Sequence, residues 1–184
     1  MADGILKVGT ITTSSGSGTI TLGQSGETIT VPSGVTLNNN GTASGFGKVL
    51  QVVSANDSTT RTTTSTSFVD IGTLSVSITP ISTSNKVLII FGTGAQVSSA
   101  GDVGYFTLDR DGTNIAPTTT NGFRNIQFGS SNGTNLVSIN YLDSPSSTSA
   151  ITYKAQFRSN TGSNTVSANW NATTGTITVM EISA

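Results

Sequence analysis

Few side chains in this sequence could carry out chemistry, and they do not gather into a catalytic set. The chain contains neither histidine nor cysteine. Ser-His-Asp and Cys-His relays are therefore excluded, as are zinc or haem sites built on those ligands. Paired carboxylates can hydrolyse glycosides, and Asp109 and Asp111 are the one acidic pair close in sequence. They flank Arg110 and precede Gly112, which is typical of a hairpin turn. We predict that the protein is not an enzyme.

The same stretch, Asp109–Asn114, faintly resembles the start of a calcium loop, in which alternating oxygen ligands surround a glycine. Such a loop needs a bidentate acidic ligand farther on. That ligand is missing, and Asn121 is the nearest substitute. We therefore expect no metal ion and no cofactor.

Trp170 is the single tryptophan, and isolated aromatic rings often stack on sugars. It alternates with Val166 and Ala168, which predicts that all three share one face of a strand. The ring is then directed into the core or toward another subunit, and core packing is favoured over ligand contact.

Phe123 and Arg124 follow a polar stretch, residues 117–121, and are expected on a loop. A structural role is the better expectation there too. The sequence leaves the receptor-binding residues unassigned.

Small polar residues and glycine dominate the composition: Thr, Ser, Gly and Asn make up 96 of the 184 residues, and the formal net charge is −1. The eight Lys and Arg residues are scattered singly. Nucleic-acid binding normally requires a basic cluster, so no such partner is expected. The longest apolar run, Val87–Phe91, is far shorter than the roughly 20 residues of a membrane-spanning helix. Met1–Val8 lacks the features of a secretory signal. No membrane insertion is expected.

Abundant Thr, Val and Ile with only two Glu and four Lys disfavour helix and favour an all-β protein. Leu74, Val76 and Ile78 alternate with polar residues, as in a half-buried strand. Asp111-Gly112 is a hairpin turn signal. About ten short strands predict a two-sheet sandwich, jelly-roll-like in architecture. The candidate strands are Lys48–Val53, Ser67–Ile71, Leu74–Ile78, Lys86–Phe91, Gly104–Asp109, Arg124–Phe128, Leu136–Leu142, Ile151–Phe157, Val166–Trp170 and Thr176–Ile182.

The N-terminal part carries a short repeat, in which glycines return at positions 18, 26, 34 and 41. Between them, pairs such as Ile20 and Leu22 or Ile29 and Val31 alternate with Thr. A unit of about eight residues buries too few side chains to form a core alone, so the units must stack on something. A shaft shared by several copies of the chain is favoured over a β-helix within one chain, and a flexible linker is the third alternative.

All 11 aromatic residues lie at or after Phe46, which places a boundary near Gly45–Gly47. We predict three parts: an N-terminal segment, residues 1–17; a repetitive β shaft, residues 18–47; and a β-sandwich head, residues 48–184.

Several stretches resemble small fibre and structural proteins of tailed bacteriophages, particularly of marine and cyanobacterial viruses. They are Lys7–Leu22, Glu27–Leu37, Gly47–Val53, Thr64–Gly72, Ser84–Ile90 and Ile177–Ile182. The resemblance implies a homotrimer in the virion, anchored to another virion protein by its N terminus. It also implies a thin shaft and a head that attaches to host surface polysaccharide.

The resulting hypothesis is a phage tail fibre or receptor-binding fibre that acts in host attachment. Two alternatives remain open. One is a head fibre, decoration or cement protein bound to the capsid. The other is a bacterial carbohydrate-binding adhesin module, against which the missing signal peptide counts.

Overall fold

The computed structural model describes residues 11, 18–22, 25–36, 38, 49–118, 120–129 and 133–184. The chain divides into two units, Met1–Phe46 and Gly47–Ala184. Among the described residues, no helix is both long enough and apolar enough to span a membrane.

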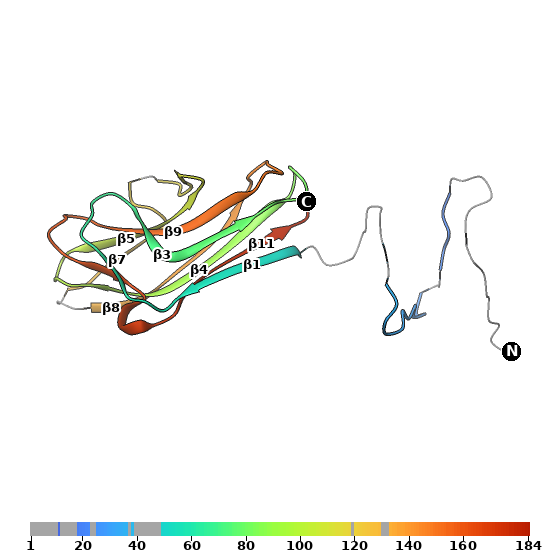
Figure 1. Ribbon diagram of the computed structural model, residues 1–184, viewed down its shortest axis with the longest axis horizontal. Coiled ribbons are helices and arrows are strands. Elements are labelled where there is room, and N and C mark those ends of the chain that lie inside the picture. Colours follow the sequence, from blue (N-terminus) through green and yellow to red (C-terminus); the bar gives the residue numbers. More distant parts are fainter. Residues whose placement is uncertain are drawn as a thin grey trace. The chain divides into compact units, whose positions relative to one another are not determined.

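Eleven strands and one 3-10 turn make up the described part of the second unit (Figure 1). In chain order they are β1 (Val49–Asp57), β2 (Arg61–Thr63), β3 (Val69–Ile78), β4 (Lys86–Val97), β5 (Val103–Arg110), β6 (Thr113–Asn114), β7 (Arg124–Gln127), β8 (Gly133–Asp143), β9 (Ile151–Ser159), β10 (Val166–Ala168), the turn η1 (Trp170–Ala172) and β11 (Gly175–Ile182).

The strands form two antiparallel sheets. In sheet A, β4 lies between β8 on one edge and β11 and β10 on the other, and β1 and β2 pair with β11 and β10. In sheet B the order is β3, β9, β5, with β6 and β7 both on the outer edge of β5. Three strands are interrupted, namely β1/β2, β6/β7 and β10/β11. Counting each as one leaves two four-stranded sheets with the strand order of a jelly roll, so the all-β sandwich prediction is confirmed.

The core lies between the two sheets and follows from the period-2 alternation of the strands. In β4, Val87, Ile89 and Phe91 are fully buried, whereas Ile90 is exposed. Tyr153 and Phe157 of β9 are among the largest buried side chains of the opposite sheet. The other core members are Ile71, Leu74, Val76, Ile78, Ala95, Val97, Phe106, Leu108, Ile126, Val137, Ile139, Ile151, Ala155, Val166, Ala168, Ile177 and Val179.

Two strand predictions require correction. The segments predicted separately, Ser67–Ile71 and Leu74–Ile78, form the single strand β3. Its pairing with β9 shifts register between Asp70 and Ser75, and Gly72 in that bulge has φ +50°. The segment predicted as Val166–Trp170 ends at Ala168, because Asn169 adopts a left-handed conformation that leaves the sheet.

The described residues of the first unit are all exposed, and none lies in a strand. Gly18, Gly26 and Gly34, three glycines of the repeat, have positive φ, the conformation that glycine adopts without steric cost. The alternating apolar residues are uncovered, with Leu22 and Ile29 each 62% exposed. The predicted anchor, residues 1–17, lies outside the described residues except for Ile11.

Candidate functional site

The candidate site is built around an interruption in sheet A, where β10 stops at Ala168 and β11 starts at Gly175. The six residues between them bulge out opposite Thr93 and Gly94 of β4, because Ala95 pairs with Ala168 and Gly92 with Thr176. Three residues of this loop, Asn169, Asn171 and Ala172, have φ between 52° and 56°. Residues other than glycine adopt this region at a cost, so surrounding contacts must hold the loop.

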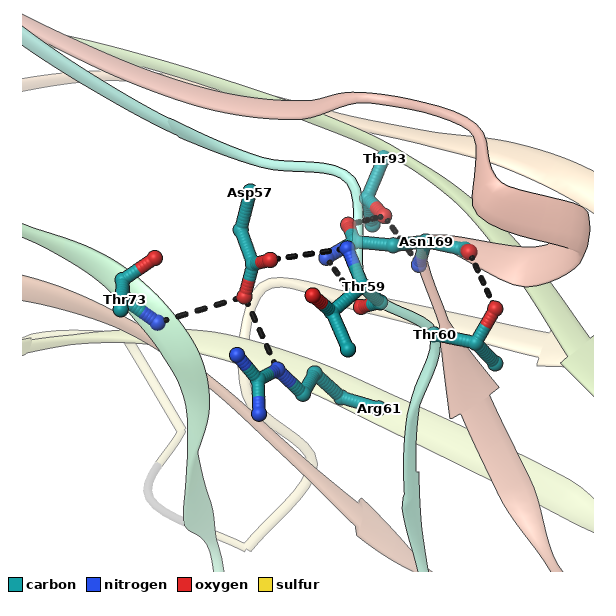
Figure 2. A network of polar contacts seen from close by, with 7 residues as sticks. All are labelled: Asp57, Thr59, Thr60, Arg61, Thr73, Thr93 and Asn169. Atoms are coloured by element: carbon teal, nitrogen blue, oxygen red, sulfur yellow. Dashed lines mark hydrogen bonds and ion pairs between the residues drawn. The ribbon is translucent and has the colours of Figure 1, made fainter.

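Asn169 supplies those contacts. The Thr93 hydroxyl donates to Asn169 Oδ1 at 2.8 Å and accepts from the Asn169 backbone N–H at 2.9 Å (Figure 2). Asn169 Nδ2 donates to the Thr59 carbonyl at 3.1 Å, and the Thr60 hydroxyl donates to the Asn169 carbonyl at 2.9 Å. Asn169 is fully buried. The side chain and backbone of Asn169 therefore fix the loop to β4 and to the break between β1 and β2.

Asp57 anchors the adjoining break between β1 and β2. It accepts hydrogen bonds from the Thr59 N–H at 2.8 Å, the Thr73 N–H at 3.3 Å and Arg61 Nε at 2.9 Å (Figure 2). Burial alone would raise the pKa of Asp57, but these bonds outweigh it and hold the pKa below the ordinary 3.8. A side chain at Gly72 would overlap the Asp57–Arg61 pair. The network thus ties the edge of sheet A to the bulge of β3.

This framework positions Trp170 at the rim of an open hollow of about 520 Å³ on the outer face of sheet A. The first residue of η1, Trp170, is half-buried, and its carbonyl accepts from the Thr173 N–H at 3.2 Å. The hollow is lined by Gly94, Ala95, Thr134, Asn135, Leu136, Trp170, Asn171 and Thr173. None of these lining residues is charged. Leu136 is 79% exposed, which leaves an apolar surface beside the ring.

Gly94 of β4 lines the hollow, and the loop leaves no room for a side chain at this position. A Cβ at this position would lie 2.5 Å from Thr173 Oγ1. The loop can therefore rest against β4 only because residue 94 has no side chain.

The uncharged lining of the hollow is suited to binding a neutral polar ligand. The amides of Asn135 and Asn171 both donate and accept, as do the hydroxyls of Thr134 and Thr173. An indole ring offers an apolar face for C–H groups. Pockets of this kind hold ligands by apolar contact and use a few polar groups for orientation.

The structure corrects the prediction for Trp170. Val166 and Ala168 are fully buried as predicted, but Trp170 does not continue their strand face. It lies after the left-handed Asn169 and lines the hollow. The two asparagines that flank Trp170 could have signalled this, because Asn tolerates left-handed φ better than most residues.

The other candidate residues lie elsewhere. Asp109 Oδ1 accepts from the Gly112 N–H at 2.9 Å, and Asp111 Oδ1 accepts from the Thr152 N–H at 2.8 Å. Both carboxylates thus bind backbone groups at a hairpin, with φ of 50° at Asp111 and 87° at Gly112. Within the described residues, no three acidic side chains gather as a metal site would require.

Phe123 packs its ring on Tyr141, with centroids 4.8 Å apart, and Arg124 begins β7. The ring contact gives Phe123 a structural role, as expected. Asn121, the nearest substitute for a calcium ligand, is exposed in the preceding loop.

Two other buried acids, Glu181 and Asp143, are bound by protein groups and lie outside the hollow. Glu181 accepts from Gln51 Nε2, Asn85 Nδ2 and the Ile81 N–H. Burial raises its pKa, but these donors outweigh burial and place the pKa below the ordinary 4.5.

Asp143 is the other acid of this pair. It accepts from Arg110 at 2.7 Å and from the Tyr153 hydroxyl at 2.7 Å. Burial and then the Asp143 hydrogen bond raise the pKa of Tyr153. These acids stabilise the sandwich.

Comparison with known proteins gives no family. No protein-family model matches the chain, and no curated protein matches it. Among solved structures, the chain is similar to one described as the structure of infectious bursal disease virus Gx strain. The identity is 16% and the TM-score 0.36, with 73% of this chain and 36% of that chain covered. The chain therefore spans about a third of that protein, and the jelly-roll assignment rests on strand order.

Proposed function

We propose that the chain is a non-enzymatic structural and binding protein of a phage virion, a fibre whose head attaches to neutral glycans on the host surface. The observation that carries the binding proposal is the uncharged hollow, in which the Trp170 ring stands beside Asn135, Asn171 and Thr173. A sugar ring presents C–H groups on one face and hydroxyls at its edges. The indole and the amides match those two features.

The absence of charge among the lining residues defines the ligand class further. A charged sugar would lose hydration in the hollow without gaining an ion pair. Binding of a neutral sugar involves no charge pairing, so its affinity should not depend on ionic strength. Ligands held by ion pairs lose affinity as salt screens the attraction.

Single hollows of this open kind bind weakly, and the proposed fibre gains strength from copy number. We propose a homotrimer, supported by the uncovered apolar residues of the N-terminal repeats, such as Leu22 and Ile29. Three linked heads raise apparent affinity through effective concentration, without a new contact.

The binding test uses the full chain on an array of neutral and acidic polysaccharides. Wild type should bind neutral glycans to the same extent at low and high salt. Trp170→Ala should weaken binding at least about tenfold, equivalent to about 1.4 kcal/mol, whereas Trp170→Phe should retain part of it. Equal binding by wild type and Trp170→Ala, or a preference for acidic glycans abolished by salt, would contradict the proposal.

The location on the particle separates a tail fibre from a head fibre or cement protein. We propose that residues 1–17 attach the chain to another virion protein. Deletion of this segment should release the protein from purified particles. In a separate experiment, antibody labelling of intact wild-type particles should place the protein on the tail if it is a receptor-binding fibre. Labelling of the capsid would replace this assignment by the decoration role.

A further inference from the structure

The outer face of sheet A carries a second surface, at the opposite end of the strands from the hollow. We infer that this surface, formed by Leu50 and Val52 of β1, Leu88 and Ile90 of β4, Leu142 of β8 and Met180 of β11, is where heads of this chain associate with one another. We call it the apolar face. The inference rests on the proposed oligomer and names the part of the head that takes part in it.

Strand pairing brings most of these residues together, and Leu50 lies at the register shift of β1, between Val49 and Gln51. Val52 pairs with Met180, Met180 with Leu88, and Leu88 with Leu142, so one row crosses all four strands. Ile90 lies two residues farther along β4, on the same side. Because Val87, Ile89 and Phe91 point into the core, the intervening residues of β4 must point outward.

The residues of the apolar face are more exposed than most large apolar side chains of the head. Val52 is 55% exposed, Leu142 47%, Leu50 43% and Ile90 38%. Of the eight exposed large apolar residues described after residue 47, six belong to strands of sheet A. Contiguous apolar surface of this kind on a soluble domain marks an interaction site.

The outer face of sheet B provides an internal comparison. There, Asp70 accepts from Lys154 Nζ and from Gln156 Nε2, each at 2.8 Å. Ser77 and Thr152 share a hydrogen bond between their hydroxyls at 2.8 Å. That face has the charged and polar side chains expected of a sheet that faces water. The two sheets therefore have different surroundings in the assembled protein.

A second copy of the same chain is the partner that fits. In a symmetric assembly the same patch recurs in each subunit, so a charge within it risks meeting its own copy. On the described strands of sheet A, Lys86 at the start of β4 is the one charged residue at an outward position. The three acids Asp57, Asp143 and Glu181 point inward, and Arg61 pairs with Asp57. Interfaces between identical subunits are also the more apolar class.

Continuity along the chain supports the same partner. β1 carries Leu50 and Val52 and begins at Val49, three residues after the end of the first unit. The repeats of that unit also leave their Ile, Leu and Val side chains exposed. Another copy of the chain is thus a suitable partner for the exposed apolar side chains of each unit. Leu88 and Gly94 are six residues apart, about 20 Å along β4, so contact at the apolar face need not fill the hollow.

The test measures the mass of the full chain in solution and the accessibility of the face. By light scattering, wild type should have a multiple of the 18.7 kDa chain mass. Ile90→Lys should reduce this multiple, whereas Ile81→Lys should leave it unchanged. Ile81 is a matched control because it is 72% exposed but lies outside sheet A. Circular dichroism should show that both variants retain β structure.

Cysteine labelling tests whether the apolar face is covered. The chain has no natural cysteine, so an introduced cysteine is the single thiol that can react. Ser54→Cys, on the outward side of β1, should react with a maleimide more slowly than Ser77→Cys on sheet B. Both serines are exposed in the single chain. A monomeric full chain would overturn this inference together with the proposed oligomer. A multimer in which Ile90→Lys keeps its mass and both cysteines react equally would overturn this inference alone.

Discussion

Thr93 and Asn169 hydrogen bond to each other twice, through the Thr93 hydroxyl to Asn169 Oδ1 at 2.8 Å and from the Asn169 backbone N–H to the same hydroxyl at 2.9 Å. The two residues are 76 positions apart in sequence and both are buried. This pair marks the point where the chain leaves sheet A, and the next residue is Trp170. The geometry of the hollow therefore depends on a contact that neither β4 nor β10 makes alone.

The first prediction concerns this pair. Asn169→Ala should destabilise the head by about 1–3 kcal/mol, because buried partners are left without hydrogen bonds, and should weaken glycan binding. Urea unfolding and the binding assay measure the two effects. Asn169→Gly is the control, since it relieves the positive φ but also lacks the amide. If Asn169→Ala were as stable as wild type, the pair would not hold the loop.

The second prediction separates the shape of the hollow from overall stability. Gly94→Ala introduces a Cβ against Thr173, so the loop must shift and glycan binding should fall. Gly92→Ala, two residues away on the same face, meets nothing closer than 3.9 Å and should bind as wild type does. Urea unfolding should show that Gly94→Ala, although destabilised by the shifted loop, is still folded under the conditions of the binding assay, and that Gly92→Ala unfolds like wild type. Equal binding by the two would place the ligand elsewhere.

The third prediction concerns pH. Asp57 and Glu181 have folded-state pKa values below their ordinary 3.8 and 4.5. A lowered folded-state pKa means that the unfolded chain binds protons more readily. Stability should therefore be full above about pH 5 and decrease as the pH falls through these ordinary values toward the folded-state ones. With no histidine in the chain, the melting temperature should be nearly constant between about pH 5 and 8. A steep change within that range would contradict this assignment.

The fourth prediction isolates one of these acids. Glu181→Gln places an amide N–H₂ among donors from Gln51, Asn85 and Ile81, so at least one hydrogen bond is lost. The cost should be about 1–3 kcal/mol in chemical unfolding, and the acid-side loss of stability should become shallower. Asp70→Asn is the matched control, since its ion pair with Lys154 is exposed, and its loss should be smaller. A Glu181→Gln variant as stable as wild type would show that the buried charge adds nothing.

Local signals predicted much of the fold. The alternation of Leu74, Val76 and Ile78 identified the inward side of β3, and Asp111-Gly112 identified the β5–β6 hairpin. Both depend on residues adjacent in sequence, where the side-chain period and the turn conformation decide the outcome.

The environment of Trp170 could not be predicted in this way. Strand alternation placed it in the core, but the strand ends at Ala168 because Asn169 bonds to Thr93, Thr59 and Thr60. Those partners are 76 to 110 residues away. The apolar face was likewise hidden in the sequence, since Leu88 and Ile90 lie in an apolar run that reads as fully buried. Pairing across four strands was needed to show which side each residue faces.

The most direct test of the proposed function is the binding of the full-length protein to neutral polysaccharide with the Trp170 variants compared side by side. We predict saturable binding that is independent of salt, is weakened at least about tenfold by Trp170→Ala and is preserved in Gly92→Ala. Undiminished binding by Trp170→Ala would contradict it.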